Sequence, residues 1–548
     1  MQVLNQDIRT RQVPACYADL VAQAENIGGL FVSLYNANAL EEALPLFASD
    51  AELKLPDSAL HFCGKEQIHT GLCQIAAQRA VALAQKRFDL HLLHSPGFYV
   101  SPDGKKLRIE WDTYSYNIAL KAAHYENETM LTRMDVWFSA ENGSVRITSL
   151  NWHVMQSWRP IIYEDFQNNP LCGMQYSYVP DSALPFAGAG EFKTLQRLAN
   201  YFVFTHFRNT DELFCGEEDD SFSMKNLFPE TVYGEDIAAK FRALSEWESR
   251  NDGKYISFML NANPVIRSDG KTAEIALWSL TMEVKGAAFG YGAGDEYIAR
   301  KLCRQFLHCR KNEKGWRVKS YELIPVAELA EKKYDKPAFI FDRMAVLGDN
   351  FGFEFPDGSS LEANAADCYA VENIVNAWVN GVRRAEIQYF INNYMKASGL
   401  PYKFDFKSSG MDAPTFDTPE SIYERTKNFD KDLIPRQPAY HTASTPLIVF
   451  NADGTHAKAC WVDYGNTNMS IAFGVEPGSN NIPYFACGDK YMHSFDKVNG
   501  IWYMTHWYFE PMISATRHYF NPEPGASKGW CGRTGEGLFQ APYEDADN

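Results

Sequence analysis

The sequence predicts an α+β protein of three tandem cone-shaped domains, and a repeated hairpin pattern is the first reason. Three stretches share a small polar residue, a proline, an apolar run, an Asp-Gly pair and an alternating run that closes on tryptophan; they are 95–111, 263–278 and 444–461. Asp-Gly between alternating apolar runs is typical of a tight hairpin, because both residues tolerate positive φ. Three such hairpins at domain-sized intervals indicate an internal repeat.

The elements around each hairpin recur as well. Upstream, a helical pattern opens with an acid in its first turn, where the helix dipole favours negative charge. Downstream, a glycine turn leads into an alternating strand. Helices followed by long antiparallel strands define an α+β architecture, in which a curved sheet can enclose a cone-shaped cavity. The upstream helix starts are 63–68, 233–237 and 418–422, and longer amphipathic helices are expected before them near 22–48, 194–213 and 368–394.

These elements divide the chain into domains. We expect them at 1–178, 190–346 and 366–525, followed by an irregular tail at 526–548. The joins have the Pro, Gly and Ala content of linkers.

Composition narrows the possible partners. The chain of 548 residues has a formal net charge of −17, from 69 acidic and 52 basic residues, which argues against nucleic acid or an anionic membrane as a partner. It lacks a bilayer-long apolar run and begins without the apolar segment of a secretory signal, so we expect a cytoplasmic protein. Its eleven cysteines form no C-x-x-C pair. We expect reduced, mostly buried thiols such as Cys303 and Cys309, and neither a zinc site nor another cofactor.

The order of elements resembles the nuclear transport factor 2-like superfamily, and within it the SnoaL-like group. The resemblance is carried by the helix end "LPLFASDAELKLP" (44–56), the helix start "GKEQI" (64–68) and the strand-turn "HLLHSPGFYVSPDGK" (91–105), and it covers nearly the whole chain, once per repeat. The superfamily holds dehydratases, isomerases, cyclases and non-catalytic binding domains, so the fold alone does not define an activity. The closest chemical comparison is with its scytalone and bile-acid dehydratases.

That resemblance implies site residues in the first repeat. Tyr35 is similar in position to the tyrosine of the scytalone type, and His91, five residues before Pro96, is in register with the family histidine. Asn36 stands where the family has aspartate, and an amide cannot exchange a proton near neutral pH.

The other repeats depart further from the family pattern. The third keeps His441 but has Trp378 and Val379 at the Tyr and Asp positions. The second has Met259 at the histidine position and Phe202-Val203 at the helix pair, so we expect it to be an inert copy.

The third repeat also offers a set of polar residues. Asp463 stands two residues after Trp461, so their side chains share a face of the strand. With Trp461 inward, Asp463 lies beside His441 and orients its imidazole. His506, on the last strand, is expected to border the same cavity. The alternative is a structural buried Asp–His hydrogen bond.

His91 and His94 do not form a metal pair by this interpretation. Residues three apart on a strand point to opposite faces, so we expect one inward histidine, His91, and one outward histidine.

Two functions from different classes follow. The first is a cofactor-free lyase (dehydratase) or isomerase acting on a hydrophobic cyclic hydroxy-carbonyl compound, with His91 or His441 as acid and base and with Tyr35 or Asp463 assisting. The second is a non-catalytic binding or scaffold protein. Three sheet faces cannot all pair within one chain, so we expect either a homodimer or a third face covered by the segments 347–367 and 521–548. The favoured arrangement has the first and third repeats facing each other and the second meeting another chain. Substrate contacts are assigned to Asn36, Trp111, Tyr440, Trp461 and His493.

Overall fold

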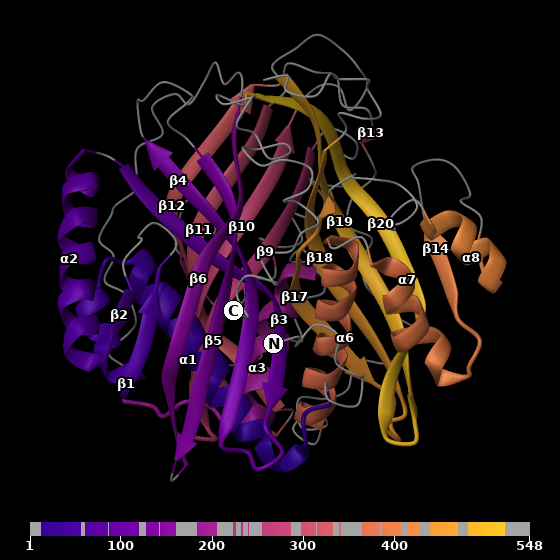
Figure 1. Ribbon diagram of the computed structural model, residues 1–548, viewed down its shortest axis with the longest axis horizontal. Helices are drawn as coiled ribbons and strands as arrows, with labels where there is room; N and C mark the ends of the chain where they lie inside the picture. Colours follow the sequence, from indigo (N-terminus) through magenta and orange to yellow (C-terminus); the bar gives the residue numbers. More distant parts are fainter. Residues whose placement is uncertain are drawn as a thin grey trace.

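The computed structural model describes residues 12–55, 61–85, 87–119, 128–141, 143–160, 183–204, 223–225, 232–233, 239, 255–285, 297–313, 315–332, 339–340, 364–383, 386–406, 415–427, 439–468 and 481–520. The architecture is α+β, with helices packed on antiparallel sheets (Figure 1). We call 12–160, 183–332 and 364–520 the first, second and third segments. Within the described residues, no helix is long and apolar enough to cross a membrane. The expected tail at 526–548 lies outside these residues.

The first segment has two long helices and a sheet. After the short 3-10 helix Ala15–Tyr17, its elements are α1 (Ala18–Asn36), the 3-10 helix Leu40–Leu46, β1 (Phe47–Lys54), β2 (His61–Cys63), α2 (Lys65–Ala84), β3 (Arg87–Val100), β4 (Lys106–Ala119), β5 (Glu128–Glu141) and β6 (Ser144–Pro160).

The second segment repeats the helix-then-sheet order. Its elements are α3 (Ala189–Phe204), β7 (Ser223–Lys225), β8 (Val232–Tyr233), β9 (Tyr255–Ser268), β10 (Thr272–Lys285), β11 (Tyr297–Asn312) and β12 (Gly315–Lys332); β13 (Phe339–Ile340) follows it.

The third segment has more short elements between its helix and its sheet. They are α6 (Ala365–Arg383), α7 (Ile387–Phe390), the π-helix Ile391–Met395, the 3-10 helix Lys396–Ser398, β14 (Lys403–Phe406), β15 (Thr415–Phe416), α8 (Pro419–Thr426), β16 (Ala439–Tyr440), β17 (Ala443–Phe450), β18 (His456–Asn468), β19 (Asn481–Val498) and β20 (Ile501–Phe520).

The helix starts predicted from acids and caps are found where the structure describes them. α2 begins after Gly64, and α8 begins after Thr418, which forms a capping box with Ser421. The stretch 234–237 lies outside the described residues. The expected helix 22–48 was too long, because α1 ends at Asn36 and Asn38 takes a positive φ of 56°. The helix expected at 368–394 likewise ends earlier, with α6 at Arg383.

Two sheets are formed by the described strands. One has fourteen strands and joins the first and third segments, through a short pairing of β20 with β6 at Tyr519↔Pro160. The other has six strands and belongs to the second segment, in the order β8-β7-β12-β11-β10-β9.

Each repeated hairpin contains a bulge at its X-Pro pair. Ser95, Asn263 and Thr445 precede the three prolines, and each has a positive φ, of 49°, 51° and 58°. The strand registers shift at these residues, so that two residues face one on the partner strand. Non-glycine residues rarely adopt this conformation, so its recurrence at three matching positions marks the bulge as a shared feature of the segments.

The bulges correct one part of the predicted repeat. The residue opposite each bulge is Trp111 in the first segment and Trp461 in the third, but Leu277 in the second. Trp278 therefore points to the other face of its strand, because side chains alternate along a strand.

The three segments pack on one another in a circle. α1 of the first segment lies on β9 of the second, α3 lies on β17 of the third, and α6 lies on β3 of the first. Asparagine side chains form many of the bonds across these contacts. Asn26 accepts the N–H of Ile266, Asn200 donates to the carbonyl of Pro446, and Asn376 donates to the carbonyl of Ser95.

This circle changes the expected arrangement of the repeats. The first and third segments do contact each other, but the second contacts both, so it is not the unmatched member. The homodimer stays a prediction.

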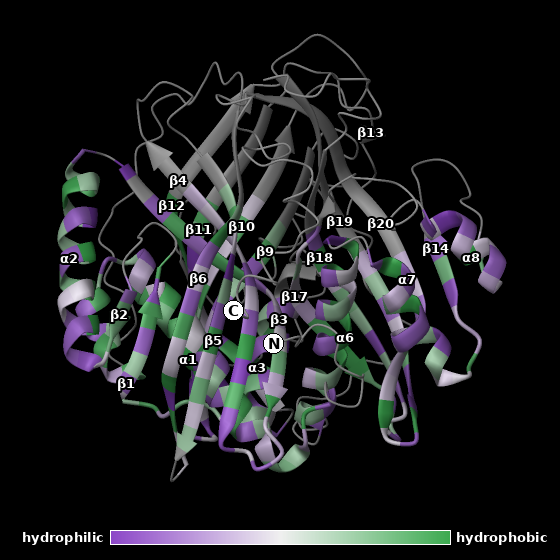
Figure 2. Ribbon diagram, viewed as in Figure 1, coloured by the Kyte–Doolittle hydropathy of each residue, from purple (hydrophilic) through white to green (hydrophobic). Residues whose placement is uncertain are grey.

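The helices differ in how much they bury. α1 and α6 are buried along most of their length, whereas α2 buries a stripe at Ile68, Leu72 and Ile75. Figure 2 shows hydrophilic and hydrophobic residues mixed along α2. The buried apolar side chains form two clusters: one is shared by the first and second segments and includes Ala365 and Tyr369 of α6, and the other lies in the third segment.

Candidate active site

The third segment brings together the histidine and the aspartate that the sequence paired. Nδ1 of His441 lies 2.6 Å from Oδ2 of Asp463, and Oδ1 of Asp463 accepts the backbone N–H of Thr442 at 2.8 Å. The Asp463 side chain is fully buried, whereas 14% of the His441 side chain is exposed. Asp463 therefore holds Nδ1, and Nε2, which has no hydrogen-bond partner among the described residues, is the nitrogen available to a ligand.

The local sequence explains why this pair forms here. His91 and His441 occupy the same place, five residues before the bulge proline. In the first segment, Ser115 of β4 lies opposite His91 of β3. In the third segment, the register of β16 and β17 with β18 places Gly465 opposite His441. Glycine offers the imidazole no hydroxyl, and the carboxylate of Asp463 takes over the bond to Nδ1.

Aromatic rings surround the His441–Asp463 pair. The hydroxyl of Tyr491 is 3.4 Å from Nδ1 of His441, and the ring centroid of Trp378 is 6.0 Å from that of the histidine. Burial raises the pKa of Asp463, and the nearby His441 works in the opposite direction. The hydrogen bond between carboxylate and imidazole thus lies in a setting of low polarity, where such a bond is electrostatically strong.

His493 lies deeper in the same aromatic interior. Its ring is within 6.1 Å of Trp378, 5.7 Å of Trp461 and 5.5 Å of Tyr491, centroid to centroid. Neither ring nitrogen has a hydrogen-bond partner among the described residues, although His493 is only 1% exposed. Burial lowers the pKa of His493 well below its usual value, so the imidazole is neutral and can both donate and accept.

His506 does not join this group. Its Nε2 lies 2.7 Å from Oδ2 of Asp405 in the neighbouring strand β14. The next residue, Trp507, packs against Trp378 inside the segment, so alternation along β20 turns His506 to the opposite face. The expectation that it borders the His441 cavity is therefore wrong. Tyr440 belongs to β16, and its side chain is not among those described.

The first segment buries His91 with both ring nitrogens bonded. Nδ1 is 2.6 Å from the hydroxyl of Ser115, and Nε2 is 2.9 Å from Oδ2 of Asp89. Asp89 also forms an ion pair with Arg79. Burial would raise the pKa of Asp89, but Arg79 and His91 outweigh it and lower that pKa. A histidine held on both sides in this way serves packing better than proton exchange with a ligand.

Tyr35 and Asn36 surround His91 from α1. The Tyr35 ring lies 5.1 Å from that of His91 and 4.3 Å below the guanidinium carbon of Arg79. Asn36 bonds both backbone groups of His91, since Nδ2 donates to the His91 carbonyl at 2.9 Å and Oδ1 accepts the His91 N–H at 2.8 Å. Asn36 thus fixes the strand rather than facing a substrate.

His94 corrects a second expectation, because it is as buried as His91, at 1% exposed. The opposite face of β3 is not solvent, since α6 of the third segment covers it. Burial lowers the pKa of His94 to about 3, and in the part of the chain that the structure describes neither ring nitrogen has a hydrogen-bond partner. His94 lines a cavity of about 40 Å³ where the three bulges meet, together with Trp111 and Trp461. A space of this size holds water rather than a cyclic substrate.

A buried ion cluster stands beside this cavity. The Lys193 ammonium, on α3, bonds Glu25 of α1 at 3.1 Å and Glu372 of α6 at 2.8 and 3.0 Å. Gln196 provides a further acceptor at 3.1 Å. Burial raises the pKa of Glu372 to about 7 despite Lys193, and burial also raises the pKa of Glu25.

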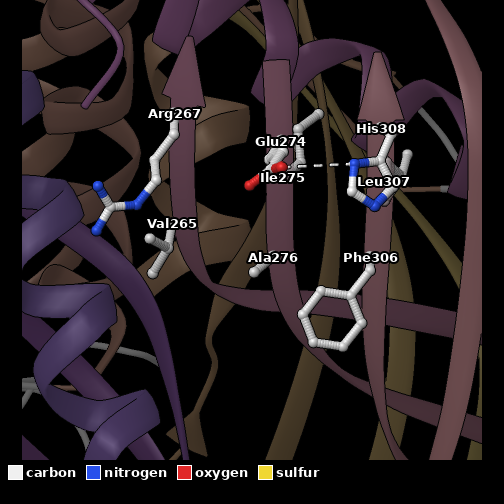
Figure 3. Close-up of a pocket in the computed structure, with 8 residues that line it drawn as sticks. All are labelled: Val265, Arg267, Glu274, Ile275, Ala276, Phe306, Leu307 and His308. Atoms are coloured by element: carbon white, nitrogen blue, oxygen red, sulfur yellow. Dashed lines mark ion pairs between the residues drawn. The ribbon is translucent and has the colours of Figure 1, made fainter. Parts of the chain in front are cut away.

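The second segment has Met259 where the others have histidine. Its sulfur accepts a hydrogen bond from Gln305 at 3.3 Å, and Gln305 also bonds Asn261 and Tyr321. A small hollow of about 10 Å³ lies on the sheet of this segment, where His308 and Glu274 approach to 3.7 Å (Figure 3). That volume is too small for an organic ligand.

Sequence reasoning missed several of these residues. Tyr491 and the Lys193 cluster were not singled out. The sequence does contain a signal for the cluster, because the triplet Glu-Asn-Ile occurs in both α1 and α6, at Glu25–Ile27 and Glu372–Ile374. Cys303 and Cys309, expected to be buried thiols on a strand, are buried in β11.

Comparison with solved structures finds proteins that resemble about a quarter of this chain. One is a putative scytalone dehydratase from Novosphingobium aromaticivorans, at 14% identity over 26% of this chain and 91% of that chain, with a TM-score of 0.21. Another is the hexachlorocyclohexane dehydrochlorinase LinA-type3 from Novosphingobium barchaimii, at 10% identity, 28% and 90% coverage and a TM-score of 0.22.

A third is an NTF2-like protein of unknown function from Pseudomonas putida, at 12% identity, 24% and 87% coverage and a TM-score of 0.20. Scores of this size carry no conclusion about activity. Neither the comparison with protein-family models nor that with curated proteins finds a match.

Proposed function

We propose that the chain is three tandem copies of a SnoaL-like domain and that its third segment is a lyase or isomerase using histidine acid–base chemistry. The single observation that carries the proposal is the 2.6 Å contact between Nδ1 of His441 and the buried carboxylate of Asp463. A carboxylate on one ring nitrogen leaves the other to exchange a proton with substrate.

In the proposed reaction, Nε2 of His441 takes a proton from the carbon next to a carbonyl. Asp463 stabilises the imidazolium that results. His493 donates to the carbonyl oxygen, on which negative charge develops. For a dehydratase, the imidazolium then returns its proton to the leaving hydroxyl, so that the substrate loses one water and the protein is unchanged. For an isomerase, the same proton returns to another carbon.

The substrate class follows from the surrounding side chains. Large apolar rings lie around His441 and His493; they belong to Trp378, Trp461, Tyr491 and Trp507. A flat, hydrophobic cyclic hydroxy-carbonyl compound fits such walls, because aromatic faces stack on flat rings and few polar groups are needed to orient it.

The test begins with ligands and then measures turnover. Cyclic enones and hydroxy-ketones are screened by thermal shift, since a ligand that binds only the folded protein raises its unfolding temperature. Compounds that bind are assayed for loss of water or for isomerisation. We expect His441→Ala and Asp463→Asn to lower kcat about 10²- to 10⁴-fold.

The matched control is His91→Gln, the same position of the first segment, which should keep kcat within a few-fold. Full activity in His441→Ala would overturn the assignment to the third segment. Loss in His91→Gln alone would move the chemistry to the first.

A second candidate function is a non-catalytic binding or scaffold protein. It is favoured by the first and second segments, where His91 is bonded on both sides and Met259 replaces the histidine. Tight binding of a cyclic compound without any turnover, unchanged by Asp463→Asn, would support this alternative.

A further inference from the structure

We propose that β1 and β2 hold a surface zinc site formed by Glu52, His61 and Cys63. The two strands are antiparallel, and Glu52 lies directly opposite Cys63 in the register. His61 stands two residues before Cys63, so the three side chains share one face of the ribbon. Burial alternates along β1, and Glu52 is on its exposed face. The site is separate from the chemistry proposed for the third segment.

Two of the three ligand-to-ligand distances match those of a tetrahedral zinc site, and the third, between the carboxylate of Glu52 and the sulfur of Cys63, is below 4.8 Å. Nε2 of His61 lies 3.4 Å from Oε2 of Glu52 and 3.5 Å from Sγ of Cys63. Zinc bonds of about 2.3 Å to sulfur and about 2.0–2.1 Å to nitrogen and oxygen, at tetrahedral angles, separate such ligand atoms by about 3.4–3.6 Å. One ion beside His61 can therefore bind all three atoms once side-chain rotation sets the distance between Glu52 and Cys63.

The three side chains are also available to a metal. Cys63 is a free, exposed thiol, and the His61 and Glu52 side chains are 40% and 54% exposed. Within the part of the chain that the structure describes, these three side chains form hydrogen bonds and ion pairs only with one another. It is also the only group of three such ligands in that part whose atoms all lie within 4.8 Å.

The ligand set favours zinc over harder or softer ions. Thiolate, imidazole and carboxylate together suit a borderline ion, whereas Mg²⁺ and Ca²⁺ take oxygen ligands. On binding, Cys63 loses its proton to solvent and the sulfur–metal bond forms; no electron is transferred. Three protein ligands leave a fourth position for water.

The sequence expectation of no zinc site was based on the lack of a C-x-x-C pair. Here the spacing is His-x-Cys within β2, and the third ligand comes from another strand. Cross-strand ligands have no fixed spacing in the sequence, which is why the pattern did not reveal them.

The experiment is a Co²⁺ titration of the tag-free, reduced full-length protein. We expect a thiolate-to-cobalt absorption band that saturates at one equivalent and disappears when Zn²⁺ is added. Cys63→Ser and His61→Ala should abolish the band, and Glu52→Gln should weaken Co²⁺ binding about tenfold or more.

The matched controls are Lys54→Ala and Cys73→Ser. Lys54 lies opposite His61 on the same ribbon, and Cys73 lies 3.6 Å from His69 on α2. Both variants should keep the band. Zn²⁺ should also raise the unfolding temperature of the wild type but not of Cys63→Ser. No band in the wild type, or a band that persists in Cys63→Ser, would overturn the proposal.

Discussion

Asn373 of α6 bonds both backbone groups of Phe98, a residue 275 positions earlier in the chain. Oδ1 accepts the Phe98 N–H at 2.6 Å, and Nδ2 donates to its carbonyl at 3.1 Å. The amide thus acts as an extra strand residue beside the bulge of β3. Asn36 does the same for His91. Asparagine is suited to this, because its side chain carries the donor and acceptor of a peptide group.

Replacing Asn373 with alanine should destabilise the whole chain. The substitution leaves a buried N–H and a buried carbonyl of Phe98 without these partners, which costs about 2–4 kcal/mol in total. Urea unfolding measures the change. Asn393→Ala is the control, because Asn393 is part-buried and its side chain donates to a carbonyl four residues earlier, that of Tyr389, rather than to another segment. Equal losses in the two variants would contradict a role specific to the contact between segments.

Lys193→Met should be more damaging. It leaves Glu25 and Glu372 buried without their counter-charge, and breaking a buried pair by removing one partner costs about 3–5 kcal/mol. The control is Lys497→Met, whose ion pair with Asp367 is partly exposed and should contribute less than about 1 kcal/mol. A Lys193→Met protein as stable as the wild type would show that the carboxylates protonate or rehydrate at little cost.

Glu372 should make stability depend on pH. Its pKa in the folded state is about 7, above the ordinary value of 4.5. Between pH 4.5 and about 7, Glu372 holds a proton in the folded state but not in the unfolded state. Its contribution to the free energy of unfolding is therefore fully present below pH 4.5 and is lost as the pH rises toward 7. The expected loss is at most about 3 kcal/mol. Glu372→Gln should remove this slope, as measured by urea unfolding from pH 4.5 to 8.

Gly29→Ala and Gly381→Ala should have opposite effects. An added methyl at Gly29 would lie 2.3 Å from the carbonyl oxygen of Pro264, so the first and second segments would have to separate. At Gly381 the nearest atom is 3.4 Å away, and alanine favours the helix by about 1 kcal/mol. We expect a lower unfolding temperature for the first variant and an equal or higher one for the second. A tolerated Gly29→Ala would contradict the close helix–bulge contact.

The sequence predicted the local elements well and their association less well. Asp-Gly turns, capping residues and alternation are local signals, and the hairpins and helix starts followed them. The same reasoning paired His441 with Asp463, because Asp463 stands two residues after Trp461 and so shares its face of the strand.

The predictions that failed concern side chains whose neighbours come from distant parts of the sequence. His94 was expected to point outward, but α6 covers that face. His506 was expected inward, but a bulge at Thr505 and the pairing with β14 turn it away. The partners of Lys193 come from three helices, and such distant contacts have no spacing rule in a single sequence.

The circular packing has a consequence for how the protein is made. A chain leaves the ribosome from its N-terminus, so the first segment emerges long before α6, which covers the outer face of β3. Until then, the carbonyls of Ser95 and Phe98 lack their asparagine partners, and Asp112 lacks Arg383, which lies 2.6 Å from it in the finished protein. A nascent chain therefore passes through a stage with an open, partly apolar seam, which is the kind of surface that chaperones bind. The third segment, which is synthesised last, therefore supplies the side chains that complete the hydrogen bonds of the first segment.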